Sequence, residues 1–295
     1  MLSTGTLSHC GIMVNYQCNA ACRHCLYSCS PARTPGYVSE DSMEEICRLL
    51  RKGGCRSVHI GGGEPFLDFE GLLMVVRKLR QAGIKLEYTE TNAFWTAPEQ
   101  DQNDAREKLG RLLAEGANCL CISLDPFHAE YIPQSAPLAL AKLCEKSGMD
   151  YFLYNASLYP LQYGGRAVNM ERESSTLFPV ENFASENSPC RNLLSTGHFH
   201  VDMDRYFIPP RCTGILIPLS EAMDGIPPGK YPAFEALYSG GVSALLQLAA
   251  EHGFTPDKSG YTSRCNLCIN LRHFLSEKEF KEFDKNHYDE ALKYC

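Results

Sequence analysis

Three cysteines near the start of the chain have a spacing that suits an iron-sulfur site. The segment CNAACRHC places Cys18, Cys22 and Cys25 with three and then two residues between them. It directly follows a short apolar run at 11–14 that is typical of a strand, so we expect the thiols on a loop at the strand's carboxyl end. Three thiolates can ligate three irons of a 4Fe-4S cubane and leave the fourth iron with an open coordination position. A zinc site or buried thiols are the alternative interpretations.

A glycine-rich turn with one acidic residue follows the next expected strand, at 57–60. Its sequence is GGGEP, at positions 61–65. Glycines allow a backbone to approach a ligand closely, and the glutamate supplies a carboxylate for an ammonium group. Taken alone, the same residues are also consistent with an ordinary tight turn. The candidate cofactor-binding residues in this turn are Gly62, Gly63, Glu64 and Pro65.

The two motifs together resemble the signature of the radical S-adenosylmethionine superfamily. The resemblance implies that the three cysteines hold a 4Fe-4S cluster whose open iron is chelated by the amino and carboxylate groups of S-adenosylmethionine. It also implies that the glycine-glutamate turn cradles the amino group. Cleavage of the cofactor then gives a deoxyadenosyl radical that removes a hydrogen atom from substrate, chemistry that belongs to the cofactor. His24 departs from the pattern, because the family often has an aromatic residue near the adenine at that position.

Two later strand ends carry polar residues that resemble the family's contacts to the cofactor. They occur in ETNAFW at 90–95 and in CISLDPFH at 121–128. Cys121 shares a strand face with Ser123 by the period of two, so we expect both to face the barrel interior. The alternative is that these polar residues merely close the ends of the strands. The cofactor-binding residues expected here are Thr91, Asn92, Ser123 and Asp125.

One arginine and one cysteine complete the expected active site. Arg166, in the segment GGRA, follows the fifth expected strand, where radical enzymes of this shape often have an arginine that reaches the cofactor or the substrate. An exposed surface arginine is the alternative. Cys121 is a candidate catalytic thiol, because a thiol in the cavity can return a hydrogen atom to a substrate radical.

A second set of cysteines lies in the C-terminal half of the chain. Two single cysteines flank an expected hairpin, and a Cys-x2-Cys pair follows about fifty residues later. Four thiolates saturate either a 4Fe-4S cluster or a zinc ion, and spacing alone cannot choose between them. The arrangement resembles the twitch domain, a shortened SPASM domain that holds one auxiliary 4Fe-4S cluster, so two clusters are expected in all. The candidate ligands of the second site are Cys190, Cys212, Cys265 and Cys268.

The combined pattern predicts an enzyme that acts on an unactivated carbon-hydrogen bond of a small polar molecule or a short peptide. Oxidation is the leading expectation, because the order of motifs along the chain is most similar to that of dehydrogenases of the 2-deoxy-scyllo-inosamine type. Epimerisation with hydrogen return from a cysteine, and thioether or cross-link formation in a ribosomal peptide, are the alternatives. The expected reductant is a flavodoxin- or ferredoxin-type protein. A non-catalytic iron-sulfur or zinc protein is a further alternative, which the glycine-glutamate turn disfavours.

A regular alternation of strands and helices must position these residues. Each strand-like run is followed by a helical pattern or a loop, which predicts parallel strands with helical crossovers. The alternation breaks after about residue 157. We therefore expect an α/β fold, with a partial TIM-type (β/α)5-6 barrel over residues 1–165 and a small α+β twitch-like iron-sulfur domain over 166–295. The strand-like runs lie at 11–14, 57–60, 85–89, 120–124 and 151–156.

Three local signals describe the C-terminal part. The segment HFHVDMDRYFI at 198–208 predicts a hairpin, and a helical pattern runs from about 232 to 252. Ser276 and Glu279 have the spacing of a capping box, which predicts a further helix after them.

The composition excludes two classes of partner. The 295 residues carry a formal net charge of -7, and no run of basic residues could follow a phosphate backbone, so a nucleic acid is not expected. No stretch approaches the roughly 18 apolar residues of a membrane span, and the first residues lack the pattern of a signal peptide. The cytoplasm is the expected location. The 15 cysteines therefore favour metal binding over disulfides.

Overall fold

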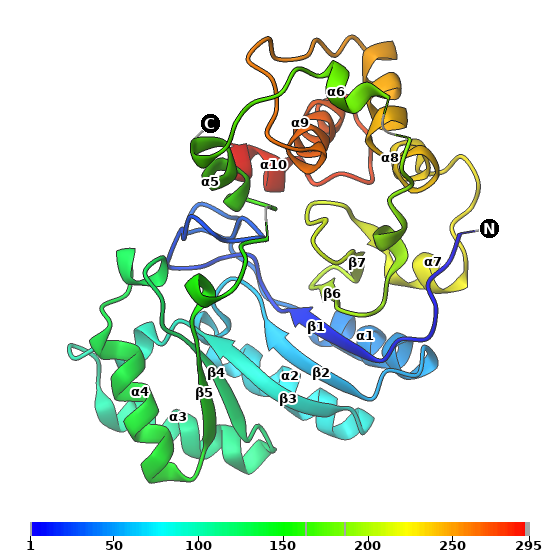
Figure 1. The fold of residues 1–295 in the computed structure, drawn as a ribbon. Helices are drawn as coiled ribbons and strands as arrows, with labels where there is room; N and C mark the ends of the chain where they lie inside the picture. Colours follow the sequence, from blue (N-terminus) through cyan, green and yellow to red (C-terminus); the bar gives the residue numbers. More distant parts are fainter. Residues whose placement is uncertain (1, 163, 186, 293–295) are drawn as a thin grey trace.

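The computed structural model describes residues 2–162, 164–185 and 187–292. Within these ranges one eight-stranded sheet runs through the molecule in the order β5-β4-β3-β2-β1-β6-β7-β8 (Figure 1). The neighbours from β5 to β6 are all parallel, whereas β7 and β8 are added as antiparallel strands. The strands are β1 (His9–Met13), β2 (Ser57–Gly61), β3 (Lys85–Thr91), β4 (Cys119–Ser123), β5 (Asp150–Tyr154), β6 (Phe199–Asp202), β7 (Tyr206–Ile208) and β8 (Ile217–Pro218).

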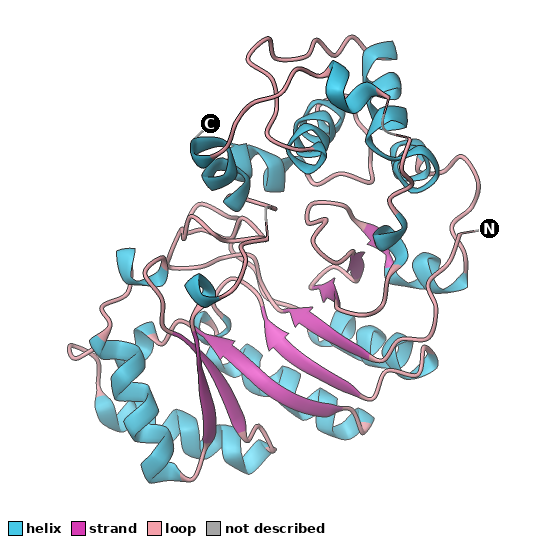
Figure 2. Cartoon of the chain, viewed as in Figure 1, coloured by secondary structure: helices cyan, strands magenta, loops and turns pink. Residues whose placement is uncertain are grey.

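Four helices connect the first five strands and cover the outer face of the sheet (Figure 2). Local caps mark several of their ends: the Ser39 and Asp68 side chains accept main-chain N–H groups at the starts of α1 and α2, and Gly83 ends α2 with a positive φ of 66°. These crossovers allow the strands to run parallel. The four helices are α1 (Glu40–Lys52), α2 (Phe69–Ala82), α3 (Gln102–Glu115) and α4 (Ser135–Ser147).

The remaining helices belong to the C-terminal part. They are α5 (Ala167–Ser174), α6 (Glu181–Ala184), α7 (Leu219–Asp224), α8 (Pro232–Glu251), α9 (Arg264–Ser276) and α10 (Lys285–Leu292). Of these, α5, α9 and α10 lie on the other side of the cysteine loop from α2–α4, whereas α7 lies beside α1 (Figure 1). Short 3-10 helices occupy Pro65–Leu67, Phe94–Thr96, His128–Glu130, Ala156–Leu158 and Arg191–Leu194.

The predicted capping box at Ser276 and Glu279 is wrong. Ser276 is the last residue of α9, where its hydroxyl donates a hydrogen bond of 2.6 Å to the carbonyl of His273. Glu279 adopts a left-handed backbone with φ of 63°, which an α-helix cannot contain. The serine therefore ends the helix that carries Cys265 and Cys268, and the next helix starts only at Lys285.

Side chains alternate between the two faces of the parallel strands. On β2, Val58 and Ile60 belong to the hydrophobic core shared with α1 and α2, while His59 lies on the inner face. On β4, Leu120 and Ile122 join the same core, and Cys121 lines an inner cavity. The period of two therefore assigns the apolar residues to the helices and the reactive residues to the interior.

The prediction of a partial α/β barrel is confirmed. The sheet has six parallel strands and remains open, because β5 lies at one edge and β8 at the other. The strand β6 comes from the C-terminal segment and pairs parallel with β1, with Cys10 opposite Phe199 and Met13 opposite Asp202. The sheet thus crosses the boundary placed after residue 165, which stays a prediction. Among the described residues, we find no helix of the length and apolar character that crossing a membrane requires.

Shortening Ile60 to alanine should destabilise the fold, because its side chain is fully buried between the sheet and the helices. We expect Ile60→Ala to lower the free energy of unfolding by about 2–5 kcal/mol. Urea denaturation of the reduced apoprotein, followed by circular dichroism, measures this loss. The matched control is Leu138→Ala, since Leu138 is 46% exposed on α4 and its loss should cost less than about 0.5 kcal/mol. Equal midpoints for the two variants would contradict the assignment of Ile60 to the core.

Candidate functional site

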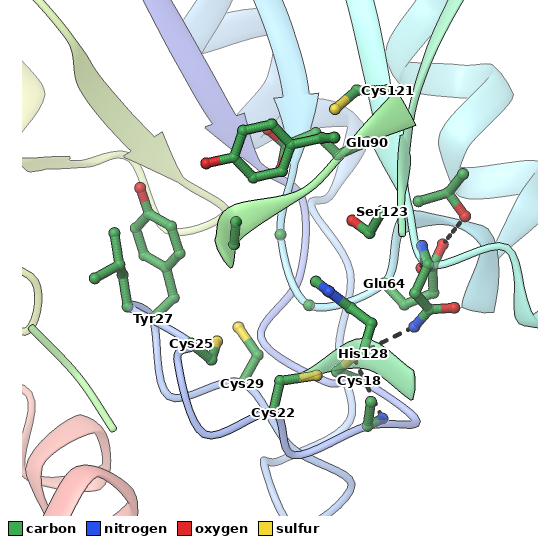
Figure 3. Close-up of a pocket in the computed structure, with 18 of the residues that line it drawn as sticks. Cys18, Cys22, Cys25, Tyr27, Cys29, Glu64, Glu90, Cys121, Ser123 and His128 are labelled. Atoms are coloured by element: carbon green, nitrogen blue, oxygen red, sulfur yellow. Dashed lines mark hydrogen bonds between the residues drawn. The ribbon is translucent and has the colours of Figure 1, made fainter. Parts of the chain in front are cut away.

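A cavity of about 560 Å³ lies at the carboxyl ends of the parallel strands. The loop after β1 closes one side of it, and Cys18, Cys22 and Cys25 all line the cavity, as does Cys29 (Figure 3). The three predicted cluster ligands are therefore brought together. Cys29 is a further cavity thiol, which the spacing of the three-cysteine motif does not single out.

The cysteine side chains of this loop differ in their hydrogen-bond partners and in their pKa. Cys18 Sγ accepts from the main-chain N–H of Ala20 at 3.4 Å and from the side-chain amide of Asn92 at 3.9 Å. Burial nevertheless raises the pKa of Cys18 to about 12. A hydrogen bond from the Cys29 thiol holds the pKa of Cys25 well below its usual range. Cys25 is therefore the thiol of this loop that ionises first.

Arg166 holds the cysteine loop in place through two hydrogen bonds. Its Nε donates to the carbonyl of Cys22 at 3.1 Å and its Nη2 donates to the carbonyl of Cys29 at 2.6 Å. The residue is only 3% exposed, lines the cavity, and its Nη1 has no hydrogen-bond partner among the described residues. A buried guanidinium with a spare N–H suits an anionic group in the cavity.

The glycine-rich turn packs directly against the same loop. Gly63 N–H donates to the Asn15 side chain at 2.9 Å, and Glu64 N–H donates to the Gln17 carbonyl at 3.0 Å. A Cβ on Gly63 would lie 1.9 Å from the Gln17 carbonyl oxygen, and Gly62 has φ of 149°. The turn therefore requires glycine for close approach. It lines the cavity through Gly62, Gly63, Glu64 and Pro65.

Glu64 joins the turn to the end of β3. One carboxylate oxygen accepts the Thr91 hydroxyl at 2.9 Å, and the other accepts the main-chain N–H of Asn92 at 2.7 Å. Burial raises the pKa of Glu64 to about 7, although these hydrogen bonds oppose the shift. The carboxylate thus fixes Thr91 and Asn92 beside the cavity. Its role toward an ammonium group stays a prediction.

The end of β4 contributes a cysteine, a serine and a histidine to the cavity. Cys121 and Ser123 both line the cavity, as the strand period predicts. Asp125 does not line it and instead borders a small neighbouring cavity. Asp125 accepts main-chain N–H groups and binds His128 Nδ1 at 2.9 Å. Burial alone would raise the pKa of Asp125, but the hydrogen bond from His128 lowers it to about 2. Asp125 therefore closes the strand end and orients His128, a cavity residue that the sequence did not single out as a site residue.

The second cysteine set also converges on one place. All four thiols line a cavity of about 210 Å³ beside α8 and α9. A hydrogen bond from Cys212 lowers the pKa of Cys190 to about 6, and Arg272 of α9 lies buried against the set. The thiols come from a loop before the 3-10 helix at 191–194, from the loop after β7, and from the first turns of α9. They are Cys190, Cys212, Cys265 and Cys268.

Both cavities fit iron-sulfur chemistry. The first offers three predicted thiolate ligands, the spare N–H of Arg166 and a glycine turn that a Cβ would block. The second offers four sulfur donors with a buried arginine to balance their negative charge.

Comparison with known proteins assigns the first half of the chain. The family model of the Radical SAM superfamily matches residues 12–151, which include the cysteine loop, the glycine turn and strands β2 to β4. This part of the chain is a radical SAM domain, of the family that uses a 4Fe-4S cluster and S-adenosylmethionine.

Two similar proteins place the chain more closely. YydG of Bacillus subtilis (strain 168), which carries the provisional name of a peptide biosynthesis protein, is 28% identical over 127 residues. That match covers 42% of this chain and 38% of YydG, so the chain matches less than half of that relative. The crystal structure of BtrN in complex with AdoMet and 2-DOIA has a TM-score of 0.53 and 14% identity, covering 81% of this chain and 90% of BtrN. The second similarity shows a shared fold that extends beyond the radical SAM domain.

Replacing Gly63 by alanine should separate the turn from the cysteine loop, because the new Cβ would collide with the Gln17 carbonyl. We expect Gly63→Ala to reduce formation of 5′-deoxyadenosine from S-adenosylmethionine and dithionite by roughly 100-fold, since small displacements at a reacting centre have large effects on rate. Gly110→Ala is the matched control, because a Cβ there meets nothing within 4 Å. Full activity of Gly63→Ala would show that the close contact is dispensable.

Proposed function

We propose that this chain is a radical S-adenosylmethionine enzyme that oxidises an unactivated carbon-hydrogen bond of a small polar molecule or a short peptide. The observation that carries the proposal is the meeting of three thiols, the glycine turn and a substrate-sized cavity at one end of the sheet. When bound, the cluster and S-adenosylmethionine would supply a deoxyadenosyl radical that takes a hydrogen atom from the substrate.

Different residues of the chain are proposed to bind the cluster and the cofactor. Cys18, Cys22 and Cys25 are the proposed cluster ligands, and Arg166 keeps their loop in place through two main-chain carbonyls. Asn92 donates to Cys18 Sγ, so it both holds a ligand and borders the cofactor space. The proposed cofactor contacts are Gly62, Gly63, Glu64, Pro65, Thr91, Asn92, Ser123 and Arg166, with Asp125 acting through His128.

Oxidation requires that the substrate lose a proton and a second electron after the hydrogen atom. His128 is suited to the proton, because Asp125 holds its Nδ1 and its ring lines the cavity. The four-cysteine cavity offers the ligands for an auxiliary cluster, which is a natural electron acceptor.

Epimerisation is the second candidate, and Cys121 favours it. Cys121 lies on the cavity wall, and burial raises its pKa well above the usual range. A protonated thiol at the cavity can return a hydrogen atom to the opposite face of a substrate radical. YydG carries a name that refers to peptides, which keeps a short peptide among the substrates to be tested.

Iron counting tests the two proposed clusters. We expect roughly eight irons per anaerobically reconstituted chain and about four when Cys18, Cys22 and Cys25 are all changed to alanine. The variant should form no 5′-deoxyadenosine with S-adenosylmethionine and dithionite. Cys47→Ala is the control, since Cys47 is a buried thiol of α1 outside both cavities. Four irons in the parent and none in the triple variant would remove the auxiliary cluster from the proposal.

The fate of the substrate separates oxidation from epimerisation. With a substrate that raises 5′-deoxyadenosine formation above its basal rate, oxidation in D2O should give a product about two mass units lighter. Under this mechanism Cys121→Ala should retain most of the product. A product one unit heavier with deuterium at the reacting carbon, lost in Cys121→Ala while 5′-deoxyadenosine persists, would establish epimerisation instead.

A further inference from the structure

We propose that His59, His198 and His200 form a binding site for a divalent metal ion of the zinc type on the inner face of the barrel. The site is distinct from both cysteine sets, and it stands independently of the reaction proposed above. Glu90 and His198 line the main cavity, so one coordination position of the metal would face the substrate space. The natural ligand for that position is a hydroxyl, amine or carboxylate of a polar substrate.

The donor atoms converge as ligands of one ion. One ring nitrogen from each of His59, His198 and His200 lies within 4.8 Å of the others. His59 Nε2 and His200 Nε2 are 3.3 Å apart, which is close to the edge of a tetrahedron whose metal-nitrogen bonds are about 2.0–2.1 Å. Glu90 Oε1 lies 3.9 Å from His59 Nε2, beside the three histidines. Three imidazoles are donors that suit zinc rather than calcium or magnesium.

Neighbouring polar groups contact both buried rings. His59 Nδ1 lies 3.0 Å from His9 Nε2, and the His9 ring lies 3.1 Å from the Ser57 hydroxyl. The Tyr27 hydroxyl lies along the edge of the His200 ring, 2.8 Å from Nδ1 and 3.1 Å from Nε2. Such outer contacts are typical of metal-binding histidines, because they fix the ring and its tautomer.

Two glycines leave room for this group of side chains. A Cβ on Gly11 of β1 would lie 2.3 Å from His200 Nε2 and 2.5 Å from His59 Nε2. A Cβ on Gly61 of β2 would lie 2.8 Å from Glu90 Oε2. The inner face therefore has no side chain on β1 beside the two ring nitrogens and none on β2 beside the Glu90 carboxylate.

The two facing ring nitrogens belong to buried side chains. His59 is 1% exposed and His200 is 8% exposed. Their Nε2 atoms face each other at 3.3 Å, so they share either one proton or one cation. A divalent cation between them would bind one lone pair of each ring.

Zinc retention by the reconstituted iron-sulfur protein tests the site. After chelator treatment and desalting, the protein is equilibrated with one equivalent of Zn²⁺ and the retained metal is measured by mass spectrometry. We expect about one zinc per chain, with X-ray absorption showing nitrogen or oxygen neighbours at about 2.0–2.1 Å and no sulfur at about 2.3 Å. Sulfur neighbours would place the zinc at the cysteines and overturn the proposal.

Variants at the histidines make the test specific. His59→Gln and His200→Gln should weaken zinc binding at least tenfold, and His198→Gln, at an exposed ring that disturbs little packing, should do the same. His252→Gln is the matched control, because His252 is exposed at the end of α8 and binds its own helix. Unchanged zinc retention in His198→Gln and His59→Gln would refute the site. Iron content and 5′-deoxyadenosine formation are read separately, so a failure here leaves the proposed reaction untouched.

Discussion

The close contact between the glycine turn and the cysteine loop is the constraint on which the site depends. Gly63 lies so near the Gln17 carbonyl that a single methyl group would fill the same space. Main-chain hydrogen bonds from the turn to Asn15 and Gln17 hold the two segments together. Because these bonds involve the backbone, the cavity floor is set by the path of the chain more than by the identity of most side chains.

A buried arginine also stabilises the cysteine loop. Arg166 binds the Cys22 and Cys29 carbonyls and keeps one N–H unpaired within the cavity. A buried cation beside several thiols lowers the cost of ionising them. The second cysteine set has a similar feature, since Arg272 lies among its four sulfurs. Each thiol-rich cavity of the described chain thus has its own buried arginine.

The open barrel explains why its inner face is so polar. A closed barrel of eight strands fills its interior with branched apolar side chains, whereas this sheet ends at β5 and continues past β1 into β6. The open interior contains histidines, tyrosines and Glu90 beside a cavity of about 560 Å³. These groups are available for binding, while the aliphatic core is confined to the side that faces the helices.

The sequence alone determined what depends on short stretches of chain. The spacing of Cys18, Cys22 and Cys25, the GGGEP turn and the first five parallel strands follow from local pattern and backbone preference. The local pattern gave a wrong prediction at Ser276, because the residues of a capping box occur here at the end of a helix.

Only the tertiary structure decided which distant residues meet. The parallel pairing of β1 with β6 places His200 against His59 across 141 positions, and the loop after β5 brings Arg166 under the cysteines. The role of Asp125 as a partner of His128 is likewise a matter of side-chain direction. Such meetings depend on strand order and register, which burial of the whole sheet fixes and which no short segment encodes.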